Sequence, residues 1–159
     1  MKLPIVSGFS LVELMFSGAL FCVFSWGMMM VLLDGLDINR QGEEMMVATA
    51  YATEALEALR SIRTARFDDL EEINTTGIEK RSGEWYLKGL DTQDEFGKFK
   101  RVIRIENARR DADGRISESG DAVDSETKKI IVTVSYMISA MHQDSVVLAT
   151  YVTRLSSMP

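Results

Sequence analysis

The feature that most constrains this chain is a run of twenty uncharged residues from Leu14 to Leu33. The run reads LMFSGALFCVFSWGMMMVLL. At about 1.5 Å of rise per residue, a helix of this length matches the hydrocarbon core of a bilayer, which is about 30 Å thick. The chain after Asp34 is polar and mixed in charge. The sequence therefore predicts a transmembrane helix over residues 14–33 and a soluble head after it.

The order of residues near the N-terminus does not fit an ordinary secretory signal. Such a signal has a basic end, then an apolar stretch of about 7–15 residues, and then a cleavage site with small residues. Here the small residue Gly8 precedes the apolar run. A cut after the run would fall near Asp34–Gly35, which lacks the small-x-small pattern. The run is therefore expected to stay in the protein as an anchor.

A single carboxylate, Glu13, stands at the edge of the apolar run. A charge at the centre of a membrane span costs on the order of 2.5–3.5 kcal/mol on insertion scales, and charges inside membranes usually mark a function. By charge alone, two readings of Glu13 stay open. The residue either rests in the headgroup zone without a specific role, or it has a partner in the membrane.

The residues around this carboxylate, Gly8-Phe9-Ser10-Leu11-Val12-Glu13, resemble the processing motif of type IV prepilins. Four features share the register of that family: a short leader with Lys2, Gly8 at its end, Phe9 next, and Glu13 four residues further. The resemblance implies that a membrane aspartyl peptidase cuts between Gly8 and Phe9 and methylates the new amine of Phe9. It also implies that Glu13 of one subunit pairs with the Phe9 amine of its neighbour.

Elementary physical chemistry explains why such a motif uses these residues. Lys2 favours an N-terminus on the cytoplasmic side, so a cytoplasmic cut must precede the span. Gly8 lets the backbone enter a narrow cleft without a side chain. In lipid, a free amine and a free carboxylate are each unfavourable alone, and pairing offsets much of that. Many family members carry a mid-span proline, which here would fall near Met30 and is absent.

We expect a removed leader at residues 1–8 and a long helix at residues 9–63, with a globular head at residues 64–159. The second half of the helix carries an apolar stripe at steps of mostly three and four residues, which predicts a face packed on a sheet. The stripe consists of Met45, Ala48, Ala52, Ala55, Leu56, Leu59 and Ile62. Residues 64–83 are rich in charged and turn-forming residues and are predicted to form a connecting loop with one helical turn near Phe67–Ile73, which the resemblance equates with the variable loop of pilins.

Four segments after this loop alternate or concentrate apolar and β-branched residues, as strands do. They are Glu84–Leu90, Lys98–Asn107, Lys129–Ser139 and Ser145–Arg154, with a turn predicted at His142–Asp144. Trp85 and Tyr86 of the first segment are expected in the core of the sheet. The predicted fold is α+β: a long N-terminal helix packed on an antiparallel sheet of about four strands, which the resemblance identifies with the pilin fold.

The composition argues against several functions. The formal charge is −6 and no basic patch stands out, so nucleic-acid binding is not expected. The chain has one cysteine, Cys22, and one histidine, His142, so an intrachain disulfide is impossible and a multi-histidine metal site is not expected. No phosphate-binding loop and no nucleophile elbow are present. We therefore expect no enzymatic activity, no catalytic residue and no cofactor.

One acidic segment is a weak candidate for calcium, because some pseudopilins bind this ion in such a loop. Its carboxylates are Asp111, Asp113, Glu118, Asp121 and Asp124. Calcium takes about 6–8 oxygen ligands, and the spacing here does not match the EF-hand template, since Gly114 comes too early. A solvated loop between two strands is the preferred interpretation, and no metal is expected.

The resemblance implies a minor pilin or a pseudopilin of type II secretion, held in the inner membrane and later assembled into an extracytoplasmic filament. Its expected partners are other pilins or pseudopilins through the N-terminal helix, the prepilin peptidase and an inner-membrane platform protein. The alternative is a single-pass membrane-anchored binding module that forms no filament. The sequence does not separate a pilus from a secretion pseudopilus.

Overall fold

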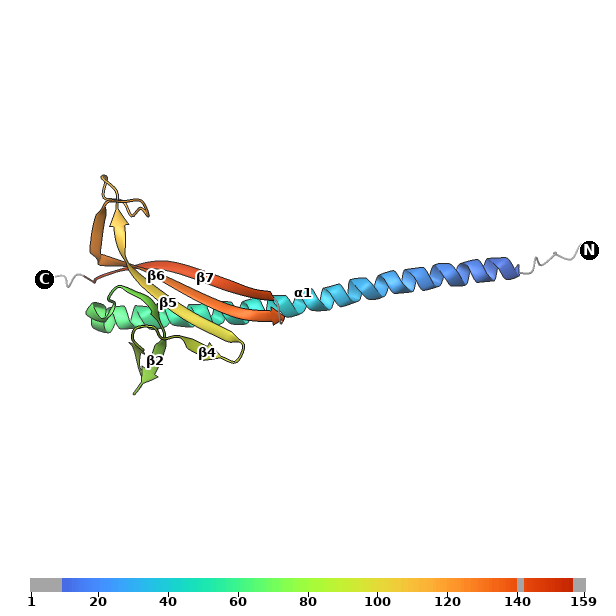
Figure 1. The fold of residues 1–159 in the computed structure, drawn as a ribbon, viewed down its shortest axis with the longest axis horizontal. Coiled ribbons are helices and arrows are strands. Elements are labelled where there is room, and N and C mark those ends of the chain that lie inside the picture. Colours follow the sequence, from blue (N-terminus) through green and yellow to red (C-terminus); the bar gives the residue numbers. More distant parts are fainter. Residues whose placement is uncertain (1–9, 140–141, 156–159) are drawn as a thin grey trace, which may run out of the picture. The chain divides into compact units, whose positions relative to one another are not determined.

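The computed structural model describes residues 10–139 and 142–155 and shows one long helix followed by an antiparallel sheet (Figure 1). The helix is α1, Leu11–Arg66, and a short 3-10 turn, Phe67–Asp69, follows it. The strands are β1 Ile73–Thr76, β2 Ile78–Arg81, β3 Glu84–Leu87, β4 Asp94–Phe96, β5 Phe99–Arg110, β6 Ala122–Ser139 and β7 His142–Thr153. The chain divides into two units at Gly42, and each unit has a character of its own.

The first unit contains the N-terminal part of α1, which begins where the Glu13 and Leu14 N–H groups donate to the carbonyl oxygen of Ser10. Its apolar side chains are exposed all round, and Phe24, for example, is 75% exposed. Within the described residues this is one helix long and apolar enough to cross a membrane, by length and composition. A surface of this kind is stable in lipid or against other apolar helices, and unfavourable in water.

The second unit is held together by small residues on the C-terminal part of α1. Ala48, Ala52, Ala55 and Ala58 are fully buried against the sheet, together with Leu59 and Ile62. Their three- and four-residue spacing keeps them on one face of the helix, and this face packs on the sheet. The predicted stripe is thus largely confirmed.

The stripe prediction was wrong at its first member. Met45 is 57% exposed, and Glu44 occupies the buried position in that turn, where it pairs with Lys98. The step of four from Glu44 to Ala48 keeps Glu44 in line with the alanines, whereas Met45 is rotated by about 100° around the axis.

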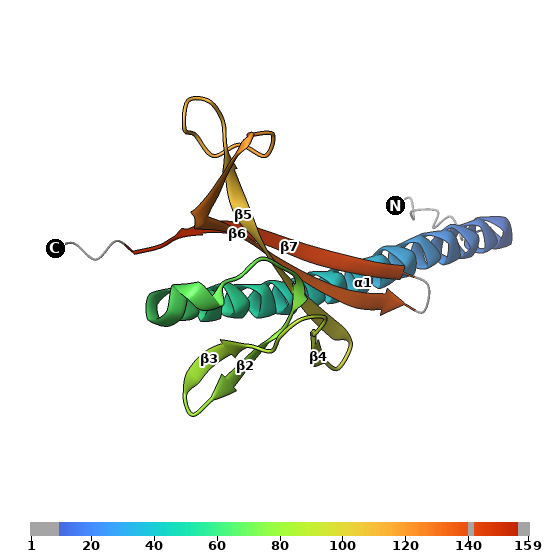
Figure 2. The ribbon, with the colours of Figure 1, turned by 60° about the vertical axis from the view of Figure 1, so that its left-hand side comes forward.

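The main sheet has the strand order β1-β5-β6-β7, and β4 pairs with β5 on the same side as β1. All these pairings are antiparallel, and the longest ladder runs from Phe99↔Tyr136 to Arg110↔Ala122. In both ribbon views β7 lies at one margin of the sheet and β4 lies at the other (Figures 1 and 2). The predicted α+β fold, a long helix packed on an antiparallel sheet, is confirmed.

Several boundaries differ from the sequence prediction. The segment 64–83 is not a loop throughout, because it holds the end of α1, the 3-10 turn, β1 and β2. The predicted strand Glu84–Leu90 ends at Leu87 and pairs with β2 in a separate hairpin. The predicted turn at His142–Asp144 is wrong, since β7 begins at His142 and its N-terminal residues pair with β6. Short polar strands such as INTT in β1 carry too little apolar alternation to be recognised.

The inner face of the sheet follows strict alternation along its central strands. Ile103 and Ile105 of β5 and three even-numbered residues of β6, Ile130, Val132 and Val134, are fully buried. Alternate residues of a strand point to opposite faces, so this pattern places the core between β5, β6 and the alanine face of α1.

We predict that enlarging a buried alanine of this face destabilises the head. Ala55→Leu adds three carbon atoms where the helix backbone meets the sheet, and overpacking of this kind costs about 1–3 kcal/mol. The full chain in detergent micelles would be unfolded with denaturant and followed by circular dichroism. The matched control is Ala50→Leu, at an exposed position of the same helix. Equal stability of the two variants would contradict the packing described.

Candidate functional site

The N-terminal candidate site is represented by Glu13, because Gly8 and Phe9 lie outside the described residues. Glu13 lies in the first turn of α1, and its carboxylate has no hydrogen bond or ion pair to any residue of the described chain. The partial positive charge of a helix N-terminus favours an acid at this place. Leu11, Val12, Leu14 and Met15 around it are all about 70% exposed. A lone carboxylate within an apolar surface is chemically suited to binding a cation.

The exposed apolar surface of α1 is the largest surface feature of the first unit. Its bulky side chains include Phe16, Phe21, Phe24 and Trp26. Soluble proteins rarely leave such a contiguous apolar surface uncovered, and those that do use it for membranes or partner proteins. The only cysteine, Cys22, lies on this segment and is exposed as a free thiol.

The acidic segment predicted as a weak calcium candidate does not gather its carboxylates around one point. Asp111 lies at the first turn of the connection between β5 and β6, and its Oδ1 accepts from the backbone N–H groups of Asp113 (3.0 Å) and Arg115 (2.9 Å). Asp121 and Asp113 are exposed. Within residues 10–139 and 142–155, no three His, Cys, Asp or Glu side chains are placed to hold a metal ion.

The two remaining acids of this segment form ion pairs instead. Asp124 lies 2.7 Å from Nη2 of Arg110, and its pKa is lowered, first by the hydrogen bond from the Thr127 hydroxyl and then by Arg110. Glu118 pairs with Lys129 of β6. The hydrogen bond from Lys129 lowers the pKa of Glu118, and the same contact raises the pKa of Lys129. These contacts satisfy both carboxylates with protein cations.

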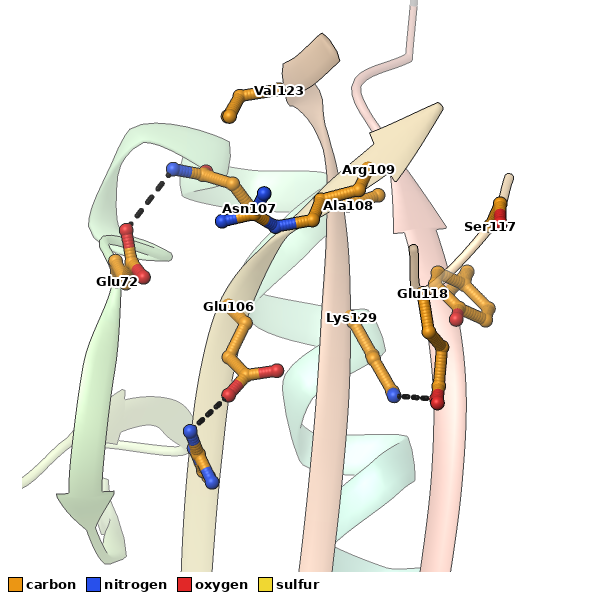
Figure 3. A pocket seen from close by; sticks show the side chains of 11 residues that line it. Glu72, Glu106, Asn107, Ala108, Arg109, Ser117, Glu118, Val123 and Lys129 are labelled. Atoms are coloured by element: carbon orange, nitrogen blue, oxygen red, sulfur yellow. Dashed lines mark hydrogen bonds and ion pairs between the residues drawn. The ribbon is translucent and has the colours of Figure 1, made fainter. Parts of the chain in front are cut away.

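The pair Glu118–Lys129 closes one side of a hollow of about 440 Å³ on the outer face of the sheet (Figure 3). Other charged groups of the hollow are paired too, whereas Arg109 donates to the carbonyl oxygen of Gly120 at 3.5 Å. Arg104 binds Glu106, and Asn107 donates to Glu72 at 3.2 Å. Ser117 also lines the hollow. The chain's one histidine, His142, is at the start of β7 and does not line the hollow, so it cannot act there as a base for Ser117. Apart from Arg109, the described residues that line the hollow therefore offer paired charges, and none of them is a nucleophile with an activating group.

A buried ion-pair network in the second unit was not anticipated from the sequence. Arg101 of β5 and Asp94 of β4 are each 2% exposed, and both Nε and Nη2 of Arg101 lie 2.9 Å from Asp94 Oδ2. Nη1 of Arg101 donates to the carbonyl oxygen of Tyr51 (2.8 Å) and to Glu54 (3.0 Å), both on α1. The guanidinium thus joins the edge of the sheet to the helix.

Asp94 extends this network to the hairpin β2–β3. Its Oδ2 accepts from the Ile78 N–H at 3.2 Å, and its Oδ1 lies 2.7 Å from the Lys88 ammonium. A Cβ on Gly77 would fall 2.4 Å from Oδ1, so this close approach requires glycine. The sequence held one sign of this burial. Arg101 is two residues away from both Phe99 and Ile103, so it lies on the same inner face of the sheet as they do. The network is structural, since every charged member has a protein partner.

The aromatic pair of β3 divides between the core and the surface. Trp85 is half-buried and packs against the core, as predicted. Tyr86 is half-buried on the opposite face of the hairpin, where the Arg66 guanidinium lies 4.1 Å from its ring centre. Cation–π contacts of this kind hold the end of α1 to the hairpin.

Comparison with family models, with curated proteins and with solved structures finds no match to this chain. The likeness of its N-terminal motif to prepilins therefore stays a prediction. Among the described residues, Glu13 combines a carboxylate without a protein partner with an exposed apolar surface around it.

We predict that Arg101→Met destabilises the head by about 3–5 kcal/mol, because it leaves Asp94 buried without its main partner. Denaturant unfolding of the full chain in micelles measures this loss. The matched control is Arg104→Met on the outer face of the same strand, where the side chain is 52% exposed and the expected change is within about 0.5 kcal/mol. Similar losses in both variants would contradict the burial of this network.

A second prediction concerns the ionisation of Glu118. Its pKa is held below the ordinary value in the folded chain, so the pair with Lys129 contributes stability at higher pH and loses it as pH falls through the folded pKa. Lys129→Gln should raise the pKa of Glu118 toward its ordinary value in a carboxyl-detected NMR titration. The pKa of Asp68, which is lowered by Arg154, serves as the internal control and should not move.

Proposed function

We propose that this chain is a type IV pilin-like subunit, a minor pilin or a pseudopilin, that works as a structural component of a filament. The single observation that carries the proposal is Glu13, an acid in the first turn of α1 that has no partner among the described residues and is followed by an uncharged run to Leu33. An acid at this place has a role if a cation is created beside it, and cleavage between Gly8 and Phe9 creates one.

The proposed maturation takes place at the cytoplasmic face of the inner membrane. Prepilin peptidase removes residues 1–8 and methylates the amine of Phe9. The apolar run then anchors the chain by a single span with its N-terminus inside, an orientation that Lys2 favours. The candidate membrane-spanning helix near the N-terminus supports the anchoring step.

The proposed assembly step is an ion pair between neighbouring subunits. The Phe9 amine of one chain meets the Glu13 carboxylate of the next, and each group loses the penalty of an unpaired charge in an apolar medium. An inner-membrane platform protein extracts the subunit into the extracytoplasmic filament. Other pilins or pseudopilins with the same kind of helix are the partners.

The different surfaces of the two parts of α1 support a structural role. The C-terminal part buries its alanine face in the head, whereas the N-terminal part leaves its apolar residues exposed around the whole circumference. A helix that is apolar all round suits lipid first and a bundle of other helices later. The proposal therefore needs no catalytic group and no cofactor.

The decisive variant is Glu13→Ala. We expect it to insert and to be cleaved as the wild type is, with N-methylated Phe9 as the first residue by mass spectrometry, and to be lost from sheared filaments. The reason is that the Phe9 amine of a neighbour has no partner in the apolar core. The matched control is Glu57→Ala, which removes an exposed acid from the same helix.

Two results would overturn this proposal. If Glu13→Ala entered filaments at the level of the wild type, the carboxylate would have no role in assembly. A product that keeps Met1 in a host with active prepilin peptidase would instead indicate a membrane-anchored module that does not enter a filament.

A further inference from the structure

The free margin of the sheet at β7 carries an unused set of main-chain hydrogen-bonding groups. β7 pairs with β6 and with no other described strand. It is twelve residues long, and the stretch from Ser145 to Thr153 holds no charged residue. Proteins commonly protect such edges with charges, prolines or short strands, because an open edge accepts another strand. The length and composition of this edge therefore mark it as an interaction surface.

The register of β7 identifies which groups are free. The Arg154 N–H donates to the Glu126 carbonyl at 2.8 Å, and the register with β6 stays constant from Thr127↔Thr153 to Tyr136↔Asp144. In an antiparallel ladder every second residue bonds to the neighbouring strand. The even-numbered residues of β7 therefore bond to β6. The odd-numbered ones direct their N–H and C=O groups to the open edge: Ser145, Val147, Ala149, Tyr151 and Thr153.

We propose that the β7 edge binds the opposite edge of the sheet of a second copy, formed by β4 and β1, and so continues the sheet from one subunit to the next. This inference rests on the proposed membrane anchoring, because anchored copies share one direction. In the strand order β1-β5-β6-β7, a copy shifted sideways without reversal brings β7 beside β1 and β4 in antiparallel orientation. Such a pairing leaves the α1 helices of all copies parallel.

The alternative pairing of β7 with β7 fails on direction. An antiparallel pair of identical strands is related by a two-fold axis, which reverses the part of α1 that packs on the sheet. Two reversed helices do not suit chains that are anchored in one membrane. The contact between β7 of one copy and the β4–β1 edge of the next joins two different surfaces, so it is heterologous. Repeated without closure, such a contact gives an open-ended assembly, as in a filament.

The charges at the ends of the two edges are complementary. β7 has Asp144 near its start and Arg154 just past its end. The opposite edge has Lys98 just past β4 and Glu71 just before β1. In the antiparallel arrangement Asp144 comes next to Lys98 of the second copy, and Arg154 comes next to Glu71. Within its own chain Lys98 also pairs with Glu44, and Arg154 also pairs with Asp68 and Glu126, so the contacts between copies would share these cations. The opposite signs favour this register over the reversed one.

One row of residues, exposed at both edges of the sheet, gives a direct test of the contact. Glu95, Lys100, Ser135 and Ser145 are consecutive partners across the sheet. Within one chain β4 and β7 are separated by three strand spacings, about 14 Å, which no disulfide can bridge. Cysteines at Glu95 and Ser145 can therefore cross-link only between copies.

The experiment uses the full chain in membranes of the expressing cell, with Cys22→Ser as background and copper phenanthroline as oxidant. The double variant Glu95→Cys/Ser145→Cys should give a ladder of dimers, trimers and larger species on non-reducing gels. Each single variant should stay monomeric. Adding Ala149→Pro should abolish the ladder, because proline removes a free N–H without removing a bond to β6, while circular dichroism shows the fold retained.

Two results would overturn the proposed contact. Dimers of Ser145→Cys alone would show that two β7 strands meet at Ser145, and a monomeric double variant in membranes would show that the edges do not meet. Failure of the proposed function is a separate result, because it is read from the first residue of the product and from the Glu13→Ala variant.

Discussion

The contact between the alanine face of α1 and the inner face of β5 and β6 is the interaction on which the rest of the structure depends. Ala48, Ala52, Ala55 and Ala58 contribute little apolar area each, but all four are fully buried in the core. The larger Leu59 and Ile62 then fill the space toward the end of the helix. Because this contact uses only the C-terminal part of α1, the N-terminal part remains available for another environment.

The Arg101 network reinforces this contact at the edge of the sheet. One guanidinium reaches the helix through Tyr51 and Glu54 and reaches β4 through Asp94. A buried ion pair adds little net stability over apolar residues of the same volume, but losing one partner is strongly destabilising. We infer that the network holds β4 and the hairpin β2–β3 in position, because these short strands have few apolar residues that could do so.

Most of the architecture was readable from the sequence because it follows hydrophobic periodicity. The uncharged run and the alanine stripe predicted the two parts of α1, and alternation predicted the strands β5 and β6. β1 and β4 escaped prediction because strands of three and four residues without apolar alternation owe their existence to their partner β5. Glu44 and Arg101 escaped it because a charged residue on an apolar face looks like an interruption until its partner is known.

The candidate sites differ in the same way: one could be recognised from the sequence, and the other could be interpreted only with the fold. Glu13 stood out in the sequence because its surroundings are apolar over many consecutive residues, so no tertiary information was needed. The acids of segment 111–124 looked alike in the sequence, and only the fold separates them. Asp111 caps its own turn, whereas Asp124 and Glu118 pair with cations that lie on other strands. Spacing in a loop does not reveal which cation the sheet will bring near.

The proposed role of Glu13 also answers a physical problem of apolar helix bundles. Burial of apolar surface is proportional to area and has no direction, so helices covered with Leu, Phe and Met can slide along one another at little cost. A single acid per helix removes this freedom, because it is satisfied at one axial position, where the amine of a neighbour lies. Glu13 lies in the first turn of α1, so the proposed pair would act at the N-terminal end of this helix. In the proposed filament, one carboxylate near the N-terminus would set the axial position of each helix relative to its neighbour.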